Sequence, residues 1–401
     1  MTTPHTQTGN EPTESFIGQA LVFAAIRLVL NTAHRMVYPF LAVFSRGLGV
    51  SLATISLAMT ARGVIGAFGP FLAVIADRRG RKTGMLTGLG IFIAGTALVV
   101  FWPTFPAFLL ALVLTMLGKY VFDPSMQAYL GDRVPYQQRG RVIAVTEFGW
   151  SLSFIIGIPA MGFLIASQGW MAPYPLLMIL GIISFISLMW LLPGDGKPTE
   201  NRTPVLRNLR AVLTYSPALA GLAIGLLISA ANEIINLVFG IWLEDSFGLQ
   251  IAALGAASAV IGFSELAGEG FSAAVTDHLG KPRAIGVGIL ANSIAALMLP
   301  FLGTTLAGAV IGLFFFYLTF EFTLVSTIPM MTEIMPSARA TLMAANISFL
   351  SIGRALGAAL ATQLYIHGLL INSLAVIILN LLALIALSQL RKHMSRNEQF
   401  V

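Results

Sequence analysis

AVIADRRGRK (residues 73–82) and AAVTDHLGKP (residues 273–282) are two copies of one short motif. Each copy follows an apolar run, and the copies begin at residues 73 and 273 of a 401-residue chain. A sequence that repeats itself after half its length, in an apolar context, is typical of a duplicated membrane protein. The copies align position by position: Asp77 with Asp277, Gly80 with Gly280, and Arg81 with Lys281.

The composition supports a membrane protein. The chain is 57% hydrophobic and 10% charged, with a mean hydropathy of +0.85, whereas soluble domains carry about 25% charged residues. It has no cysteine, which excludes disulfides, thiolate metal sites and a cysteine nucleophile. It also lacks a phosphate-binding Walker loop and zinc-type histidine spacing, so we expect neither ATP-driven transport nor an enzyme, and no catalytic residue, metal or cofactor.

Twelve apolar runs of about 20 residues or more follow one another along the chain, each long enough to cross a bilayer. Backbone polar groups in lipid must bond within their own segment, so each run is expected to be an α-helix. We therefore predict an all-α membrane protein with twelve transmembrane helices in two pseudo-symmetric six-helix halves. The predicted spans are residues 16–44, 52–76, 83–102, 105–130, 142–167, 172–193, 214–243, 250–276, 284–302, 305–332, 340–366 and 369–390.

The basic residues outside these spans predict the orientation. Arg46 alone lies in the loops on one side, and all the others lie on the opposite side, which is therefore expected to be cytoplasmic. Both termini are then cytoplasmic, and residues 1–15 lack the basic segment of a signal peptide. The predicted parts are a tail (1–15), an N-terminal half (16–193), a linker (194–213), a C-terminal half (214–390) and a second tail (391–401).

A second repeat follows spans four and ten. GDRVPYQQRG (residues 131–140) and TEIMPSARA (residues 332–340) both place an acid three residues before a proline and an arginine shortly after it. With the first repeat, twelve spans and a central linker, the chain resembles the major facilitator superfamily over nearly all its length, although Ala73 replaces the usual first glycine. The resemblance implies that charges at the cytoplasmic mouth close the outward-facing state. The expected gating residues are Asp77, Gly80, Arg81, Asp132, Arg139, Asp277, Gly280 and Lys281.

In that superfamily spans 1, 4, 7 and 10 line the cavity, spans 2, 5, 8 and 11 form the interface between the halves, and the remaining spans face lipid. Lipid-facing helices do not tolerate charge, and spans 3, 6, 9 and 12 contain none here. The chain departs from the drug-antiporter branch, because Leu112 stands where that branch has a basic residue. Its proton mechanism is therefore not carried over.

Polar residues of span 1 lie on one stripe about 100° wide. We expect this stripe to face a water-filled cavity, with Arg27 and Arg35 binding an anionic or hydrogen-bond-accepting group; the alternative is that such charges only lock helices together. His34 is either a proton carrier or a hydrogen-bonding neighbour. Lys119 and Asp123 have the spacing of a pair within one helix. The expected substrate-binding residues are Arg27, Asn31, Arg35, Tyr38, Lys119, Asn232 and Asn236.

The charges inside the spans are unevenly divided between the halves. The N-terminal half has more bases than acids, and the C-terminal half has four glutamates against Arg354. Burial and like-charge repulsion favour the neutral form of a carboxyl group, so we expect at least one of these glutamates to carry a proton near neutral pH. The expected proton-coupling residues are Glu233 and Glu321, followed by Asp123 and Glu269. The expected residues of interface charge pairs are Arg62, Glu147, Glu265 and Arg354; if Glu265 pairs with Arg354, it is a poor candidate for proton coupling.

These features predict a proton-coupled secondary active transporter working by alternating access, with export of an amphiphilic or anionic organic molecule as the leading function. The alternatives are a proton-coupled importer of a sugar or organic acid, a lipid flippase and, from another class, a membrane scaffold or sensor on a transporter fold. The expected partners are a small-molecule substrate, protons and membrane lipid, without nucleic acid. We expect a monomer in the inner (cytoplasmic) membrane.

Overall fold

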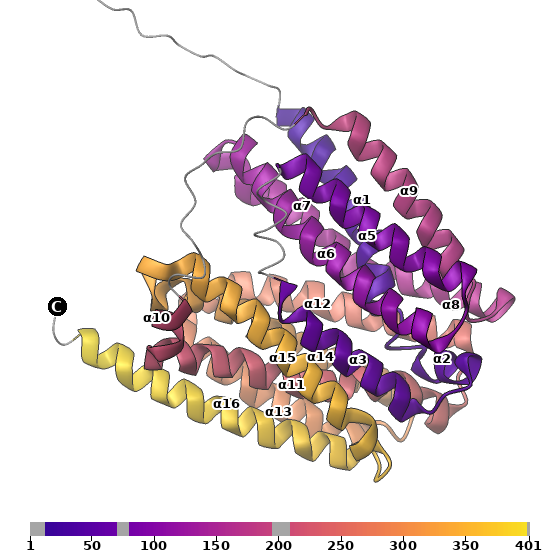
Figure 1. Cartoon of the computed structure of the whole chain (residues 1–401). Helices are drawn as coiled ribbons and strands as arrows, with labels where there is room; N and C mark the ends of the chain where they lie inside the picture. Colours follow the sequence, from indigo (N-terminus) through magenta and orange to yellow (C-terminus); the bar gives the residue numbers. More distant parts are fainter. Residues whose placement is uncertain (1–12, 70–79, 195–208, 399–401) are drawn as a thin grey trace, which may run out of the picture.

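The computed structural model describes residues 13–69, 80–194 and 209–398. The regular structure of these residues is helical throughout (Figure 1). Asp77 and most of the predicted linker lie outside the described residues. The N-terminal half consists of α1 (Thr13–Arg35), α2 (Leu41–Leu48), α3 (Leu52–Gly66), α5 (Arg81–Phe101), α6 (Phe105–Arg133), α7 (Tyr136–Leu152), the π-helix η1 (Ser153–Gly157), α8 (Ile158–Gln168) and α9 (Pro173–Leu191).

The C-terminal half repeats this arrangement of long antiparallel helices. It consists of α10 (Leu209–Thr214), α11 (Ser216–Phe247), α12 (Ile251–Leu279), α13 (Lys281–Leu302), α14 (Leu306–Ile334), the short η3 (Pro336–Ala338), α15 (Arg339–Tyr365) and α16 (Leu369–Glu398). Among the described residues, 11 helices are long and apolar enough to cross a membrane, and up to 12 when the bent pair α2 and α3 counts as one span. The predicted fold class, an all-helical membrane bundle, is confirmed.

The first predicted span, residues 16–44, is not one helix. Helix α1 ends at Arg35, and residues 36–40 form a turn before α2 begins at Leu41. Pro39 lies in this turn and lacks the N–H that would continue the helical ladder. A glycine with left-handed φ (66°) at Gly49 then ends α2, and α3 leaves at an angle of 112° to it.

The two halves meet at one end of the bundle and diverge at the other. In Figure 1 they converge near α2 and spread apart toward α7 and α10. We name the end where the halves meet, which holds Arg46, the opposite end. We name the end where they diverge the basic end, because it holds the starts of α5, α13 and α15 at Arg81, Lys281 and Arg339. Across the halves, a Cβ on Gly240 would lie 2.3 Å from the carbonyl oxygen of Pro39. The backbones therefore touch directly where the opposite end is closed.

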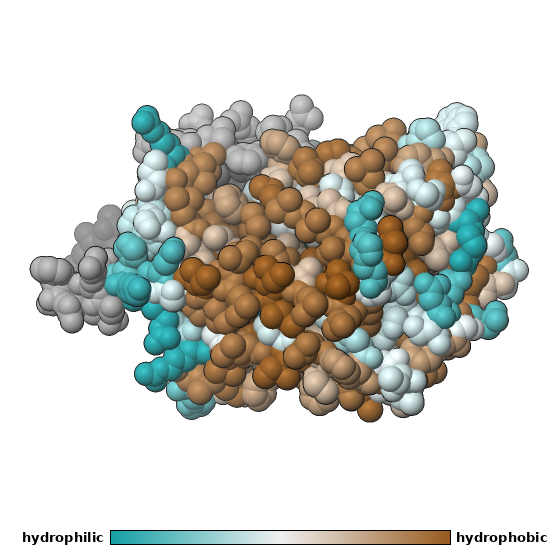
Figure 2. All heavy atoms as spheres, turned by 90° about the horizontal axis from the view of Figure 1, so that it is seen from below, coloured by the Kyte–Doolittle hydropathy of each residue, from teal (hydrophilic) through white to brown (hydrophobic). Residues whose placement is uncertain are grey.

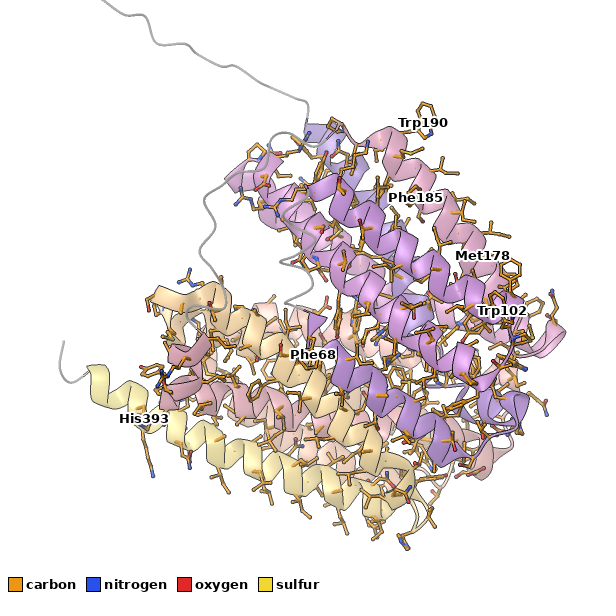
Figure 3. The ribbon with its side chains drawn as sticks, in the orientation of Figure 1. Phe68, Trp102, Met178, Phe185, Trp190 and His393 are labelled. Carbon is orange, nitrogen blue, oxygen red and sulfur yellow. The ribbon has the colours of Figure 1, made fainter. Side chains whose placement is uncertain are left out.

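The outer surface is suited to lipid. Figure 2 shows a broad hydrophobic belt with hydrophilic residues gathered toward its two ends. Trp190 on α9 is 81% exposed and Trp102 is 62% exposed, and Figure 3 shows them toward the two ends of the N-terminal half. Tryptophan is enriched at both faces of a bilayer, so these rings mark the expected depth of the membrane.

The orientation yields a direct test. Because the chain has no cysteine, single cysteines at Thr104, Thr304 and Arg283 report their own positions without background. Thr104 and Thr304 lie exposed at the opposite end and Arg283 at the basic end. Thr104→Cys and Thr304→Cys should react with a membrane-impermeant maleimide in intact cells, and Arg283→Cys only after permeabilisation, because basic loops stay cytoplasmic. Labelling of Arg283→Cys in intact cells would reverse the predicted orientation.

Candidate functional site

A cavity of about 620 Å³ lies between the halves. One wall comes from α1, α6 and α7, and the other from α11, α12, α14 and α15. It extends toward the basic end, since its lining includes Ile328 and Ile347 from the parts of α14 and α15 nearest that end. Its charged lining residues are Arg27, His34, Arg35, Lys119, Glu147, Glu233, Glu265, Glu269, Glu321 and Arg354.

A compact charge cluster occupies the N-terminal wall. Arg27 on α1 forms an ion pair with Glu147 on α7 (2.8 Å) and another with Asp123 on α6 (3.3 Å). Lys119 pairs with the same Asp123. Two bases and two acids thus neutralise one another, and Arg27 also donates to the carbonyl oxygen of Thr146. Arg27 is thus paired within its own half, and its expected role in substrate binding stays a prediction.

The most buried ion pair joins the halves. Arg35 at the end of α1 holds Glu265 on α12 through both carboxylate oxygens, and the Nη1–Oε2 distance is 3.0 Å. The guanidinium also lies between two rings, 4.0 Å from the centre of Trp150 and 3.9 Å from that of Phe154. A planar arginine pairs well with a carboxylate in this way while stacking on aromatic faces.

A pair between Glu265 and Arg354, which the order of the spans allowed, does not form, because Glu265 pairs with Arg35. Helix α12 packs closely against the end of α7 and against η1, since a Cβ on Gly262 would lie 2.6 Å from the carbonyl oxygen of Ser151 and 2.6 Å from the side chain of Ile155. The contact turns Glu265 toward Arg35. The π-helix itself precedes Pro159, which cannot donate a backbone hydrogen bond, and such turns relieve a proline inside a helix.

A second polar bridge crosses between the halves. Arg62 on α3 donates to the hydroxyl of Tyr38 (2.8 Å) and to the carbonyl oxygen of His34 (2.7 Å). The Tyr38 hydroxyl in turn donates to Glu233 on α11 (2.9 Å). Arg62 therefore reaches a carboxylate through a tyrosine rather than as a direct ion pair. On the same helix Asn236 accepts a hydrogen bond from Tyr317.

Three charged groups of the cavity differ from these. Within the part of the chain that the structure describes, Glu269, Glu321 and Arg354 make no hydrogen bond and no ion pair. Glu321 on α14 is 6% exposed. It lies against α12, since a Cβ placed on Gly268 of α12 would be 2.8 Å from the Cβ of Glu321. The two acids are thus neighbours on the C-terminal wall, and Arg354 faces the same cavity from α15.

The remaining predicted residues take different places. Asn31 is fully buried outside the cavity lining, where it donates to the carbonyl oxygen of Gly149, so its expected position in the cavity is wrong. Asn232 and His34 line the cavity, and the Nδ1 atom of His34 has no hydrogen-bond partner in the part of the chain that the structure describes. Among the described residues, no group of three or more His, Cys, Asp or Glu is placed to hold a metal ion.

The aromatic and apolar lining was missed by the sequence reasoning. On α14 the lining residues Tyr317, Phe320, Glu321, Leu324, Val325 and Ile328 recur at helical spacing. That spacing around the single charge Glu321 was the signal available for them. Without knowledge of which face pointed inward, such residues look like any apolar span.

The two sequence repeats form matching ion pairs at the basic end. Arg81 pairs with Asp132 (3.0 Å) in the N-terminal half, and Lys281 pairs with Glu333 in the C-terminal half. Gly80 and Gly280 precede these bases with positive φ of 108° and 80°, a conformation that favours glycine. Both pairs stay within their own half.

Two further predicted gating residues, Arg139 and Asp277, lie at the same end. Arg139 donates to the carbonyl oxygen of Val134, and Asp277 is exposed. Gating by this set therefore stays a prediction for a state in which the basic end is closed.

The contribution to stability of the buried ion pair Arg35–Glu265 can be compared with that of the more exposed ion pair Arg46–Glu244. Glu265→Gln should lower the free energy of unfolding by about 3–5 kcal/mol, because it leaves Arg35 buried without a counter-charge. The matched control is Glu244→Gln, whose partner Arg46 is 58% exposed at the opposite end; it should cost about 1 kcal/mol or less. Unfolding of purified protein in mixed micelles measures both. Equal effects would show that Arg35 and Glu265 do not stabilise the contact between halves.

Comparison with known proteins agrees with this architecture. The chain matches the family model of the Major Facilitator Superfamily over residues 21–362. It is 27% identical over 353 residues to the MFS-type transporter YceJ of Bacillus subtilis, covering 86% of this chain and 88% of that relative. It is 26% identical over 331 residues to the inner membrane transport protein YdhP of Escherichia coli, covering 80% and 81%.

A solved structure has the same fold. It is a bacterial homologue of the human lysosomal transporter Spinster in an inward-facing, unoccupied conformation. The TM-score is 0.74 at 15% identity, over 94% of this chain and 97% of that one. The family match, the two six-helix halves and the central charged cavity lead to one conclusion: the chain belongs to the Major Facilitator Superfamily and is a secondary transporter that works by alternating access, not an enzyme.

Proposed function

We propose that the protein is a proton-coupled antiporter that exports an amphiphilic organic molecule across the inner membrane. The observation that supports this most is the pair Glu269 and Glu321. Both are carboxyl groups on the cavity wall with no cationic or hydrogen-bonding partner among the described residues. Such a group can gain and lose a proton without breaking a structural bond, which is what a coupling site requires.

The other acids are less suited to this role. Asp123 holds Lys119 and Arg27, Glu233 accepts from Tyr38, and Glu265 holds Arg35. Protonating any of them removes a bond that anchors a helix or joins the halves. Of the four residues expected to couple protons, Glu269 and Glu321 therefore become the leading pair, and Glu233 and Asp123 become secondary candidates.

The apolar part of the cavity supports an amphiphilic substrate. Toward the basic end the C-terminal wall carries Leu324, Val325 and Ile328 on α14 and Ile347 on α15, facing Phe148 on α7. Farther inside, α11 and α14 present Asn232, Glu233 and Glu321 to the same space. A molecule with an apolar body and a polar head fits this gradient, because the body buries apolar surface near the mouth.

Antiport requires that proton and substrate exclude each other at one site. In a state open to the outside, Glu269 and Glu321 take up protons. In the state open at the basic end, the protons leave and the substrate enters. The halves then rock about the central site, and the cross-half contacts Arg35–Glu265 and Tyr38–Glu233 must open during that movement.

Reconstituted protein tests the coupling. The protein is placed in liposomes that contain a trapped pH-sensitive dye. Three solutes that share a phenylbutyl group but differ in their charged head are then added: a trimethylammonium cation, a dimethylglycine zwitterion and a sulfonate anion. At least one should drive proton movement opposite to its own, and Glu321→Gln or Glu269→Gln should reduce that movement to the level of protein-free vesicles while substrate exchange survives. Glutamine keeps the shape of the side chain and removes the titratable proton.

The control is Glu333→Gln, which removes an exposed acid at the basic end and should leave proton movement unchanged. Wild-type proton movement in both cavity variants would contradict coupling at these residues. Proton movement in the same direction as the solute would replace antiport by uptake.

A further inference from the structure

Among the described residues, Arg354 differs from the other arginines and the lysine buried inside the bundle. Arg27 and Lys119 are neutralised by carboxylates of their own half, and Arg35 by Glu265. Arg62 is held by Tyr38 and His34. In the described part of the chain Arg354 forms no hydrogen bond or ion pair, yet it lines the cavity. Glu233 and Glu321 line the same cavity, but neither forms an ion pair or hydrogen bond with it in the described part of the chain.

The backbone beneath Arg354 is held firmly. A Cβ on Gly353 would lie 2.2 Å from the carbonyl oxygen of Leu226, and one on Gly357 would lie 2.5 Å from that of Ala230. These two glycines seat α15 directly on α11. On another side, the Cα of Ala355 would be 3.0 Å from a Cβ on Gly63. Within the C-terminal half α15 is therefore seated closely on α11, and it presents Arg354 to the cavity from a defined position, as a preorganised binding group does.

A substrate that fills the cavity removes the water around Arg354. A guanidinium that loses its water without gaining a partner is costly inside a membrane protein. The substrate must therefore supply the counter-charge itself. A carboxylate does so best, because the planar fork of arginine binds its two oxygens at once.

Glu269 and Glu321, the two cavity acids without a partner among the described residues, require a positively charged or hydrogen-bond-donating group instead. When Glu269 and Glu321 have released their protons, a substrate beside them must bring positive charge or hydrogen-bond donors. We infer that the substrate is a zwitterionic amphiphile whose anionic group binds Arg354 and whose cationic group replaces the protons of Glu269 and Glu321. This inference rests on the proposed antiport for the acids, whereas the role of Arg354 follows from its own surroundings.

The shape of the cavity fits the same molecule. Along α15 the lining residues Ile347, Leu350, Ser351 and Arg354 recur at helical spacing and form one stripe. The stripe is apolar near the basic end and ends in the charge. Ser351 is fixed by the hydroxyl of Tyr120 across the halves (3.2 Å). A charged head beside Arg354 therefore leaves its apolar body against Ile347 and Leu350.

The three phenylbutyl compounds named above separate the contributions, because they share one apolar body. Binding is measured by competition with the radiolabelled dimethylglycine zwitterion on purified protein in lipid nanodiscs. In the wild-type protein the zwitterion should bind more tightly than the trimethylammonium cation or the sulfonate anion. Arg354→Gln should weaken zwitterion binding by about tenfold to a hundredfold, leaving it no tighter than the cation. Arg354→Lys should restore part of the difference.

Unchanged affinity for the cation shows that Arg354→Gln is folded, and Arg46→Gln serves as the control for a base outside the cavity. The inference is overturned if Arg354→Gln keeps the zwitterion preference, if the sulfonate binds wild-type protein most tightly, or if none of the three binds. Proton movement is measured separately in liposomes. Binding that depends on Arg354 without proton movement would reject the antiport proposal and leave the role of Arg354 standing.

Discussion

A charge inside a membrane bundle needs a partner or water, and this requirement organises the centre of the protein. The bidentate pair of Arg35 and Glu265 meets it between the halves, stacked between two aromatic rings. The cluster around Arg27 and Asp123 meets it within one half. Glu269, Glu321 and Arg354 have no such partner among the described residues, and they line the cavity, where water can reach them. The helices that carry no charge are left to face lipid.

This division separates structural charges from functional ones. Charges with a protein partner hold helices in place or close the opposite end, and changing them alters stability first. Glu269, Glu321 and Arg354 hold no helix through a hydrogen bond or ion pair among the described residues, so changing them should alter binding and coupling first. Because all three lie on the C-terminal half, we expect that half to carry the ligand-specific chemistry and the N-terminal half to supply a neutral, rigid wall.

Much of the fold was predictable from local patterns. Apolar runs of membrane length and the duplicated AVIADRRGRK motif were sufficient for two six-helix halves, because span length and repetition do not depend on tertiary contacts. The break after Arg35 was missed because Pro39 lies within an apolar run that reads as continuous. The spacing of polar residues on span 1 correctly placed Arg27, Arg35 and Tyr38 at the cavity, but Asn31 turns into the contact with α7.

Charge partners were the least predictable feature. Span order shows which helices can meet, but the depth and rotation of each helix decide which side chains touch. Glu265 reaches Arg35 rather than Arg354 because close glycine contacts seat α12 on η1. Glu147 on α7 reaches Arg27 because the depth and rotation of α7 bring the two side chains together. A single sequence does not contain these distances, so the unpartnered state of Arg354 emerged only from the structure.

We expect the halves to rock about the cavity, with the opposite end closed in the conformation described. Distances between spin labels on the cysteine-free background measure this most directly. One pair joins Thr104 and Thr304 across the halves at the opposite end, and another joins Arg133 and Arg283 at the basic end. Raising the proton concentration should lengthen the first distance and shorten the second, and Glu265→Gln should favour the same change. Distances that both stay fixed, or that lengthen together, would contradict the account.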